Sequence, residues 1–353
     1  EITLKNNTSL DYENQTSHTL QVTINDGLNT SQAHDITIDL TDKNDTPPVI
    51  ADVTFTVAED LSEADTIGSI TYADEDTING TATYAISSNP DNLFQIDAST
   101  GSISLQNGKS LDYENQTSHT LEVTVNDGVN TSTSKEITIN VTDVNDNAPT
   151  ITTKSLNSNE GSTATIGTIA FSDIDTSNDT FTFSITSDPD NLFEIDSSTG
   201  VVSLQAGKNL NYENKTSHTI AVTVNDGVNT SATQDVTINV NDINDNTPDV
   251  TTSDFATNED ITDSTTIGTV AFSDLDTING TTVFAITNDA DNLFEIDAAN
   301  GLISLQAGKS LDFQTSSSHT ITVTVNDGIH TSAAQNITIT VNDANDNAPQ
   351  ITT

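Results

Sequence analysis

A run of aspartate and asparagine residues that ends in proline occurs three times, nearly unchanged, in this chain of 353 residues. The copies are Asp143–Pro149, Asp242–Pro248 and Asp343–Pro349, and a looser copy, Asp42–Pro48, precedes them. Such a run cannot pack in an apolar core, because its polar groups would lose their hydration. It does present several carboxylate, amide and carbonyl oxygens within a few residues, and these are the ligands that calcium takes in proteins. The four runs therefore predict calcium sites.

The runs recur about every 100 residues, which is the length of one small domain. The spacing predicts a partial repeat over 1–46, complete repeats over 47–147, 148–246 and 247–347, and the start of a further repeat at 348–353. Both ends fall inside a repeat, so we expect the chain to be a piece of a longer array. The runs then lie at joints between domains, and we call those at Asp42, Asp143 and Asp242 the first, second and third joint.

Within each repeat, apolar and polar residues alternate in short segments separated by turn residues. Val53–Val57 and Leu121–Val125 show this period of two, and Leu93–Asp97 leads through Gly101 into another such segment. About seven short strands result, with no helical period. We therefore predict an all-β chain, built as a tandem array of seven-stranded Greek-key sandwiches joined end to end. Strand patterns alone do not separate the immunoglobulin, fibronectin and other sandwich types.

The composition excludes some classes of partner. Against 8 Lys and Arg stand 53 Asp and Glu, and this net charge of −45 would repel nucleic acid and anionic membrane surfaces. No apolar run approaches the roughly 20 residues of a membrane span, so we expect no membrane insertion. Only 33% of the residues are hydrophobic and none is cysteine, so thin cores of this kind would need metal rather than disulfides to support them. The regular alternation argues against a disordered acidic chain.

Five motifs in a fixed order resemble a cadherin repeat. They are an acidic residue at the end of the first strand (Glu59), an Asp-x-Asp pair (Asp74 and Asp76), Leu-Asp-Tyr-Glu at 111–114, Asn-Asp-Gly at 126–128, and the Asp/Asn run at 143–149. The resemblance covers essentially the whole chain. The Asn- and Thr-rich style further resembles the cadherin-like modules of large bacterial surface adhesins.

The resemblance implies up to three Ca²⁺ ions at each complete joint and assigns their ligands by position. At the second joint these are Glu59, Asp112, Glu114, Val144, Asn145, Asp146, Asn147, Asp173, Asp175, Asn178 and Asp226, with Val144, Asn147 and Asn178 acting through backbone carbonyls. At the third joint they are Glu160, Asn211, Glu213, Ile243, Asn244, Asp245, Asn246, Asp274, Asp276, Asn279 and Asp327. At the first joint they are Asp11, Glu13, Asn44, Asp45, Asp74, Asp76, Asn79 and Asp127.

Three departures from the pattern weaken particular sites. Asn211 replaces the usual Asp at the third joint, which removes one negative charge, so we expect at least one ion to bind more weakly there. The first joint has no counterpart of Glu59, because that strand would precede residue 1. In the last repeat Gln314 replaces Glu, and we expect the terminal site to be poorly occupied.

The same residues also have plainer explanations. A single Asn-Asp-Gly indicates a turn, and only its recurrence with the other motifs favours calcium. The histidines at 18, 119, 218 and 319 all stand in the context Ser-His-Thr, which indicates one repeated structural position. Because no nucleophile, metalloprotease or phosphate-loop motif is present, we predict no catalytic residues and no enzyme activity.

We therefore predict a calcium-stiffened stalk of a secreted bacterial adhesin or surface fibre that supports cell adhesion outside the cell. Its partners would be calcium, further repeats of the same polypeptide and neighbouring copies. One alternative is a carbohydrate- or cell-recognition module with a glycan or cell-surface partner, although the chain has no Trp and only 5 Tyr to build sugar platforms. Others are homophilic adhesion, and a filament in which a neighbouring chain completes residues 1–46.

Overall fold

The computed structural model describes residues 1–6, 8–78, 80–177, 180–278 and 280–349, and every regular element in them is a β-strand. Within these ranges no helix exists with the length and apolar character needed to cross a bilayer. The chain divides into two compact units, one made of residues 1–148, 173–180 and 226–229, the other of the remainder. The first and second joints lie within the first unit and the third joint within the second.

Residues 49–142 form a four-stranded sheet, a three-stranded sheet and a two-stranded pair around one core. The larger sheet has the order β4 (Thr54–Ala58), β11 (Lys135–Thr142), β10 (Ser118–Asn126) and β7 (Thr83–Ser88). Only β4 and β11 are parallel, and the other neighbours are antiparallel. The smaller sheet has the order β5 (Gly68–Ser69), β9 (Ser102–Leu105) and β8 (Phe94–Ile96), and β3 (Val49–Ile50) pairs with β6 (Tyr72–Ala73). This is the Greek-key sandwich that the sequence predicts.

The second unit contains the same arrangement twice. The first set comprises β12 (Thr150–Ile151), β13 (Ser155–Asn159), β14 (Gly167–Thr168), β15 (Phe171–Ser172), β16 (Thr182–Ser187), β17 (Phe193–Ile195), β18 (Val201–Leu204), β19 (Ser217–Asn225) and β20 (Gln234–Asn241). The second comprises β21 (Asp249–Val250), β22 (Phe255–Asn258), β23 (Gly268–Thr269), β24 (Phe272–Ser273), β25 (Val283–Asp289), β26 (Phe294–Ile296), β27 (Leu302–Leu305), β28 (Ser318–Asn326) and β29 (Gln335–Asn342). The strand orders repeat those of the first unit.

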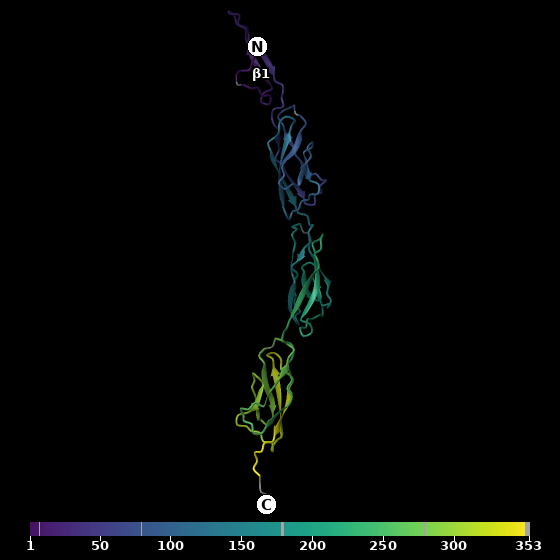
Figure 1. Cartoon of the computed structure of the whole chain (residues 1–353), viewed down its shortest axis with the longest axis vertical. Coiled ribbons are helices and arrows are strands. Elements are labelled where there is room, and N and C mark those ends of the chain that lie inside the picture. The colour runs from purple at the N-terminus through teal and green to yellow at the C-terminus, as the bar shows by residue number, and fades with distance from the viewer. Residues whose placement is uncertain (7, 79, 178–179, 279, 350–353) are drawn as a thin grey trace. The chain divides into compact units, whose positions relative to one another are not determined.

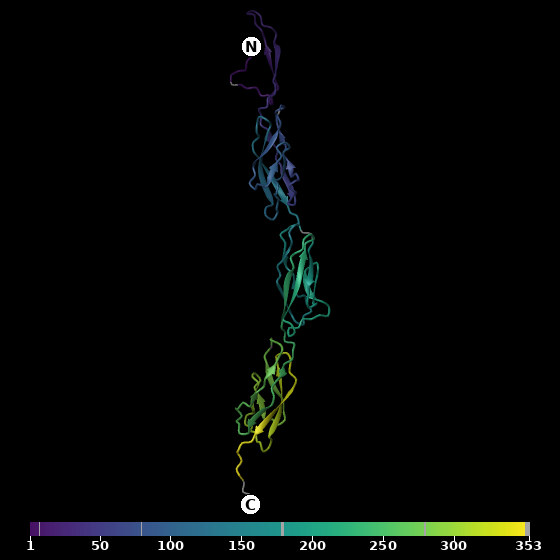
Figure 2. The ribbon, with the colours of Figure 1, turned by 45° about the vertical axis from the view of Figure 1, so that its right-hand side comes forward.

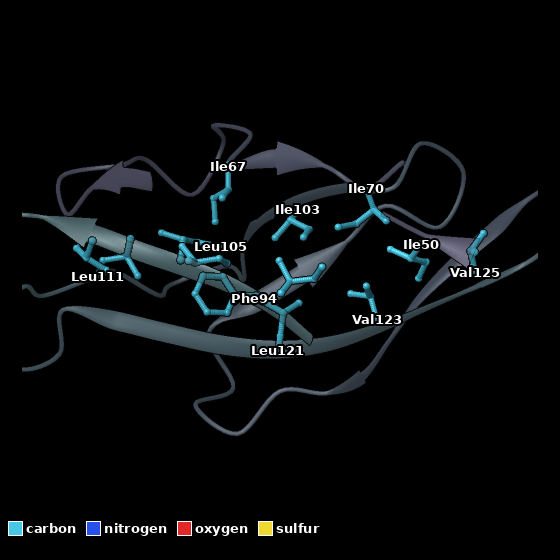
Figure 3. Close-up of a cluster of buried hydrophobic side chains, with 13 residues drawn as sticks. Ile50, Ile67, Ile70, Phe94, Ile103, Leu105, Leu111, Leu121, Val123 and Val125 are labelled. Atoms are coloured by element: carbon cyan, nitrogen blue, oxygen red, sulfur yellow. The ribbon is translucent and has the colours of Figure 1, made fainter. Parts of the chain in front are cut away.

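Each core draws on the alternating apolar residues of one repeat. In β10, Leu121, Val123 and Val125 are at most 1% exposed, while the residues between them face outward. Figure 3 shows Leu121 below Phe94, with Leu105 and Ile103 on the opposite side of the core. Burial of one such side chain stabilises the fold by about 1.5–3 kcal/mol. The period-two segments are therefore confirmed as strands, while the domain boundaries stay predictions.

One apolar segment is divided between two strand pairs in the structure. The segment from Ile67 to Tyr72 forms two strands of two residues, and β5 pairs with β9 whereas β6 pairs with β3. Between them the backbone N–H of Ile70 donates to the carbonyl of Gly101 at 3.0 Å. Because the buried Ile67 and Ile70 are three residues apart, a continuous strand of period two cannot turn both side chains into the core.

Residues 1–46 contain a single antiparallel pair, β1 (Ser17–Val22) and β2 (His34–Asp39), drawn in purple in Figures 1 and 2. Leu20 and Val22 of this pair correspond to the buried Leu121 and Val123, yet they are 39% and 37% exposed. No second sheet covers this apolar face within the described residues. The pair contains the counterparts of β10 and β11, and the partial repeat over 1–46 stays a prediction.

Candidate metal centre

Glu59 is the buried anchor of the second joint. It follows β4, is only 5% exposed, and its two carboxylate oxygens accept hydrogen bonds from separate segments. Oε1 accepts from the backbone N–H of Val144 at 2.8 Å, and Oε2 accepts from that of Tyr113 at 2.5 Å. A single side chain thus holds the acidic loop at 111–116 against the start of the joint.

The acidic side chains on this side of the second joint converge. One carboxylate oxygen each from Glu59, Asp112 and Glu114 lies within 4.8 Å of the others. They line a hollow of about 230 Å³ together with Asp146 and Asn147. Asp112 is held by the backbone N–H of Asn115, which donates to its Oδ1 at 2.8 Å. Like charges at this separation repel one another unless a cation lies between them.

Residues that follow β15 supply the other side of the second joint. Asp175 is 4% exposed, and both of its oxygens accept from Asn147, at 2.9 Å from the backbone and 2.8 Å from the side chain. A second acidic group forms here, in which Glu114, Asp143 and Asp175 place one oxygen each within 4.8 Å of one another. Asp173 contributes a further buried oxygen, Oδ2, that accepts no hydrogen bond.

Asp226 closes the second joint from the Asn-Asp-Gly turn. It is fully buried, and its Oδ1 accepts from the backbone N–H groups of Val228 and Asn229 at 2.8 and 2.7 Å. Its Oδ2 is buried and accepts no hydrogen bond. The Asn145 amide donates to the Asp226 carbonyl at 3.4 Å. The interpretation of Asn-Asp-Gly as a turn therefore accounts for the contacts of Asp226 Oδ1. It does not account for Oδ2, which has no donor and is available to a cation.

The electrostatics of the second joint favour a bound cation. Burial raises the pKa of Glu114, and the negative charges of Glu59, Asp143 and Asp175 raise it further. Burial and the neighbouring carboxylates likewise raise the pKa of Asp146. A raised carboxyl pKa means that the negative form is disfavoured in this environment. A bound divalent cation would offset the unfavourable free energy of the negatively charged carboxylates.

The third joint repeats this geometry with one charge fewer. Glu160 is 2% exposed and accepts from the backbone N–H groups of Tyr212 at 2.6 Å and Ile243 at 2.9 Å. Glu160, Glu213 and Asp245 place one oxygen each within 4.8 Å of one another. Asn211 keeps the local role of Asp112, since its Oδ1 accepts from the N–H of Asn214 at 2.7 Å, but it brings no negative charge.

Further described residues of the third joint repeat contacts and electrostatics seen at the second joint. Asp276 is 4% exposed and accepts from Asn246, whose backbone N–H lies 2.9 Å and side-chain amide 2.7 Å from its oxygens. Burial and nearby carboxylates raise the pKa of Glu213 and that of Asp245. Asp274 has a buried Oδ2 that accepts no hydrogen bond.

The first joint contains two acidic groups. Glu13, Asp45 and Asp76 form one, and Asp74, Asp76 and Asp127 form the other, each with its oxygens within 4.8 Å. Asp76 accepts from the backbone N–H groups of Asp45 at 3.0 Å and Thr46 at 2.9 Å. Asp11, whose Oδ1 accepts from the N–H of Asn14 at 2.8 Å, lines the adjacent hollow.

Two kinds of joint residue are missing from the sequence prediction. The first is the leading aspartate of each run: Asp143 Oδ2 accepts from the backbone and hydroxyl of Thr176, and its Oδ1 is buried without a donor. Burial acts to raise its pKa, but the hydrogen bonds from Thr176 and Ser177 outweigh burial and lower it. Its place as the first residue of a repeated motif was the available signal.

The second kind is the residue three positions after the aspartate of the Asn-Asp-Gly turn. Asn130 donates its amide to Asn44 Oδ1 at 2.7 Å, and Asn229 donates to Asn145 Oδ1 at 3.2 Å. At the third joint this position is His330, whose Nδ1 lies 3.1 Å from Asn244 Oδ1. The contacts join residues more than 80 positions apart, so local spacing does not reveal them. The predicted ligands Asn79, Asn178 and Asn279 lie outside the described residues.

The donor set fits a hard cation. Buried carboxylate oxygens without a hydrogen-bond donor occur at Glu114, Asp143, Asp173 and Asp226, all at one joint. An oxygen-only set of carboxylates and amides is what calcium takes with 6–8 ligands, whereas zinc is usually bound by Cys or His. The chemistry of the second joint therefore fits calcium, and the residues that would hold it are the predicted ligands Glu59, Asp112, Glu114, Asp146, Asp173, Asp175 and Asp226.

The repeated histidines have a structural role. His119 Nδ1 lies 2.7 Å from Asp91 Oδ2, and its buried ring packs edge-on against Phe94 with centroids 5.6 Å apart. The same pair occurs at His218 and His319, with His–Asp distances of 2.7 and 2.6 Å. The position therefore joins a loop to the core in each complete repeat.

Comparison with known proteins finds the same kind of domain three times along the chain. The family model of the cadherin domain matches residues 53–142, 153–241 and 253–342. Protocadherin gamma-B6 of Homo sapiens is 34% identical over 156 residues, which are 42% of this chain and 16% of that protein. Protocadherin Fat 1 of Homo sapiens is 33% identical over 239 residues, 62% of this chain and 5% of that protein. The chain thus spans a small part of the length of these relatives.

Solved structures agree on the fold. Extracellular cadherin domains 3–6 of protocadherin gamma B2 superpose with a TM-score of 0.64 at 21% identity, covering 96% of this chain and 86% of that one. A protocadherin gammaB7 cis-dimer structure gives a TM-score of 0.62 at 20% identity, covering 94% of this chain and 86% of that one. At such identity the likeness shows the fold alone. The relatives named here are animal proteins, so the bacterial adhesin class stays a prediction.

Proposed function

Because the chain belongs to the cadherin domain family, we propose that it is a calcium-stiffened spacer in the extracellular part of an adhesion protein. One observation carries the proposal: at the second joint, buried carboxylate oxygens without donors come from both sides of the connecting segment. Cadherin domains bind calcium at the linkers between domains. No catalytic role is part of this proposal.

The residues at each joint have different roles in binding calcium. Glu59 holds the loop that carries Asp112 and Glu114, so these carboxylates are placed before an ion arrives. Asp175 is held by the joint itself, through both donors of Asn147. The ion would supply positive charge shared by both groups. A joint that links residues from two repeats through one cation loses much of its freedom to bend.

The calcium affinity of a joint determines in which environment the joint is stiff. Extracellular calcium modules have dissociation constants of about 10⁻⁴–10⁻³ M, and a ligand at ten times its Kd stabilises the bound state by about 1.4 kcal/mol. Ions shared across a joint therefore stabilise modestly at the calcium level outside cells and hardly at all at the level inside them. This favours display outside the cell, with neighbouring copies as partners. Its Asn- and Thr-rich style favours a surface adhesin as the parent protein.

The test is small-angle X-ray scattering of the chain in millimolar calcium and in EDTA, with a melting curve on each sample. We expect a larger maximum dimension, a narrower range of shapes and a higher melting temperature in calcium. The variant Asp146→Asn should lose part of these effects, whereas Asp235→Asn, at an exposed position of β20, should not. Identical scattering and melting in calcium and EDTA would overturn the proposal, as would equal effects of the two variants.

A further inference from the structure

Besides Asn211, the third joint differs from the others at a second position, which faces its acidic residues. The residue three positions after the turn aspartate is Asn29, Asn130 and Asn229 in the first three copies and His330 in the fourth. Asn130 and Asn229 bring an amide N–H to the joint, and this nitrogen has no free lone pair to bind a metal. A neutral imidazole does have one. Among the three joints, the third therefore has a potential nitrogen ligand for a metal ion at this position, in His330.

The imidazole lies beside a buried carboxylate oxygen that accepts no hydrogen bond. Asp327 is fully buried, and its Oδ1 accepts from the backbone N–H groups of Ile329 at 2.7 Å and His330 at 2.8 Å. Its Oδ2 is buried, accepts no hydrogen bond, and lies 3.9 Å from His330 Nδ1. Asn244 Oδ1 lies 3.1 Å from the same nitrogen. Asp274 Oδ2 is likewise buried and without a donor.

These distances suit one ion bound by several of the atoms. Zinc binds His nitrogen and carboxylate oxygen at roughly 2.0–2.2 Å, so two of its ligands lie about 3–4 Å apart. The two distances from His330 Nδ1 are within that interval. Asp74 and Asp127 of the first joint are the counterparts of Asp274 and Asp327. Together with Asp76 they place one carboxylate oxygen each within 4.8 Å of the others, so negative charges lie close together at this position of a joint.

We propose that His330, Asp327, Asp274 and Asn244 form a site for a divalent transition-metal ion of the zinc class at the third joint. Imidazole suits Zn²⁺, Cu²⁺ and Ni²⁺, whereas calcium takes oxygen ligands. The remaining oxygens of this joint, at Glu160, Glu213 and Asp245, stay suited to calcium. One joint would then respond to two metals, while the second joint, with Asn229 in place of His330, would respond to calcium alone. The inference rests on the proposed joint function.

The test uses Zn²⁺ alone as the probe, added to the whole chain in millimolar calcium and followed by calorimetry. We expect one Zn²⁺ to bind at least about tenfold more tightly to the wild type than to His330→Asn, which has the residue found at the other joints. The control His34→Asn, at an exposed position of β2, should bind Zn²⁺ like the wild type. The imidazole resonances of the 6 histidines identify the ligand directly, and that of His330 should shift with Zn²⁺.

The outcomes separate this inference from the proposed function. Equal Zn²⁺ affinity of the wild type and His330→Asn, or loss of binding in His34→Asn alone, would overturn the zinc site. His330→Asn should keep the calcium-dependent rise in melting temperature, because Asn serves at this position in the second joint. If calcium changes neither melting nor scattering in the wild type, the proposed function fails whatever zinc does.

Discussion

Asn211 and Asp112 occupy the same place in two joints and differ by one charge. Both accept a hydrogen bond from the residue three positions later, so the loop geometry is kept in either case. Calcium affinity rises with the number of carboxylates around the ion. The difference between the second and third joints is therefore electrostatic rather than a matter of folding.

We expect Asn211→Asp to strengthen calcium binding at the third joint several-fold, and Asp112→Asn to weaken it at the second joint by a similar factor. Calorimetric titration with calcium would measure both. The melting temperature in EDTA should change little, because neither variant alters the hydrogen bond that holds the loop. Unchanged calcium affinity in both variants would mean that these positions do not bind the ion.

The raised pKa of Glu114 gives a second prediction, for protein without calcium. Burial, followed by the charges of Glu59, Asp143 and Asp175, raises the pKa in the folded state above the ordinary value of 4.5. The stabilising contribution of the protonated form is complete below 4.5 and is lost as pH rises through the folded value. In EDTA, lowering the pH from neutral toward 4.5 should therefore raise the melting temperature.

Glu114→Gln separates this effect from others. It removes the charge at every pH, so in EDTA at neutral pH we expect a melting temperature a few degrees above that of the wild type and a weaker dependence on pH. In calcium the order should reverse, because the variant has lost a ligand. A variant that melts below the wild type in both EDTA and calcium would show that Glu114 stabilises the fold by other contacts.

At the scale of the elements, the turns before and after β9 each contain a glycine in the left-handed region. Gly101 has a φ of +69°, and a Cβ placed there would lie 2.9 Å from the ring of Tyr84. Gly108, after β9, has a φ of +74° but no atom within 4 Å of such a Cβ. The two positions share the backbone conformation and differ in packing.

We expect Gly108→Ala to destabilise the fold by about 1–2 kcal/mol, which is the cost of left-handed backbone for a residue with a Cβ. Gly101→Ala should cost more, because the new methyl group also displaces Tyr84 from the core. Urea denaturation in saturating calcium would measure both. Equal losses would show that Tyr84 moves aside without cost.

For the molecule as a whole, the joints should differ in strength. The second joint has the full set of acidic residues, whereas the third has Asn211 in place of an aspartate. We therefore expect the third joint to need more calcium than the second. The first joint contains Lys43, one of only 8 Lys and Arg residues in the chain, and this side chain is exposed.

Trypsin can report on this joint through Lys43. We expect cleavage after Lys43 to be fast in EDTA and to slow as calcium is added, because a bound ion would hold the chain near Asn44 and Asp45 in one conformation. Cleavage after the exposed Lys5, which lies outside the joint residues, should not depend on calcium. Mass spectrometry of the products would distinguish the two sites. Calcium-independent cleavage after Lys43 would mean that the first joint binds no ion.

Much of this protein is determined by its sequence alone, because its features are local and repeated. The alternation of apolar and polar residues over Leu121–Val125 predicts a strand without any knowledge of its partner strand. Gly101 predicts a turn, because glycine adopts a positive φ without steric conflict. The acidic runs predict a hard cation from the chemistry of their oxygens. All of these follow from a residue and its near neighbours.

Only the tertiary structure decides which distant residues meet. It divides the segment Ile67–Tyr72 between two strand pairs, brings Asp143 to Thr176, and places His330 beside Asn244. None of these contacts has a signal in local spacing, since each depends on how strands from separate parts of the chain pair and pack. The types of ligand are thus local chemistry, whereas their convergence on one point is a property of the folded chain.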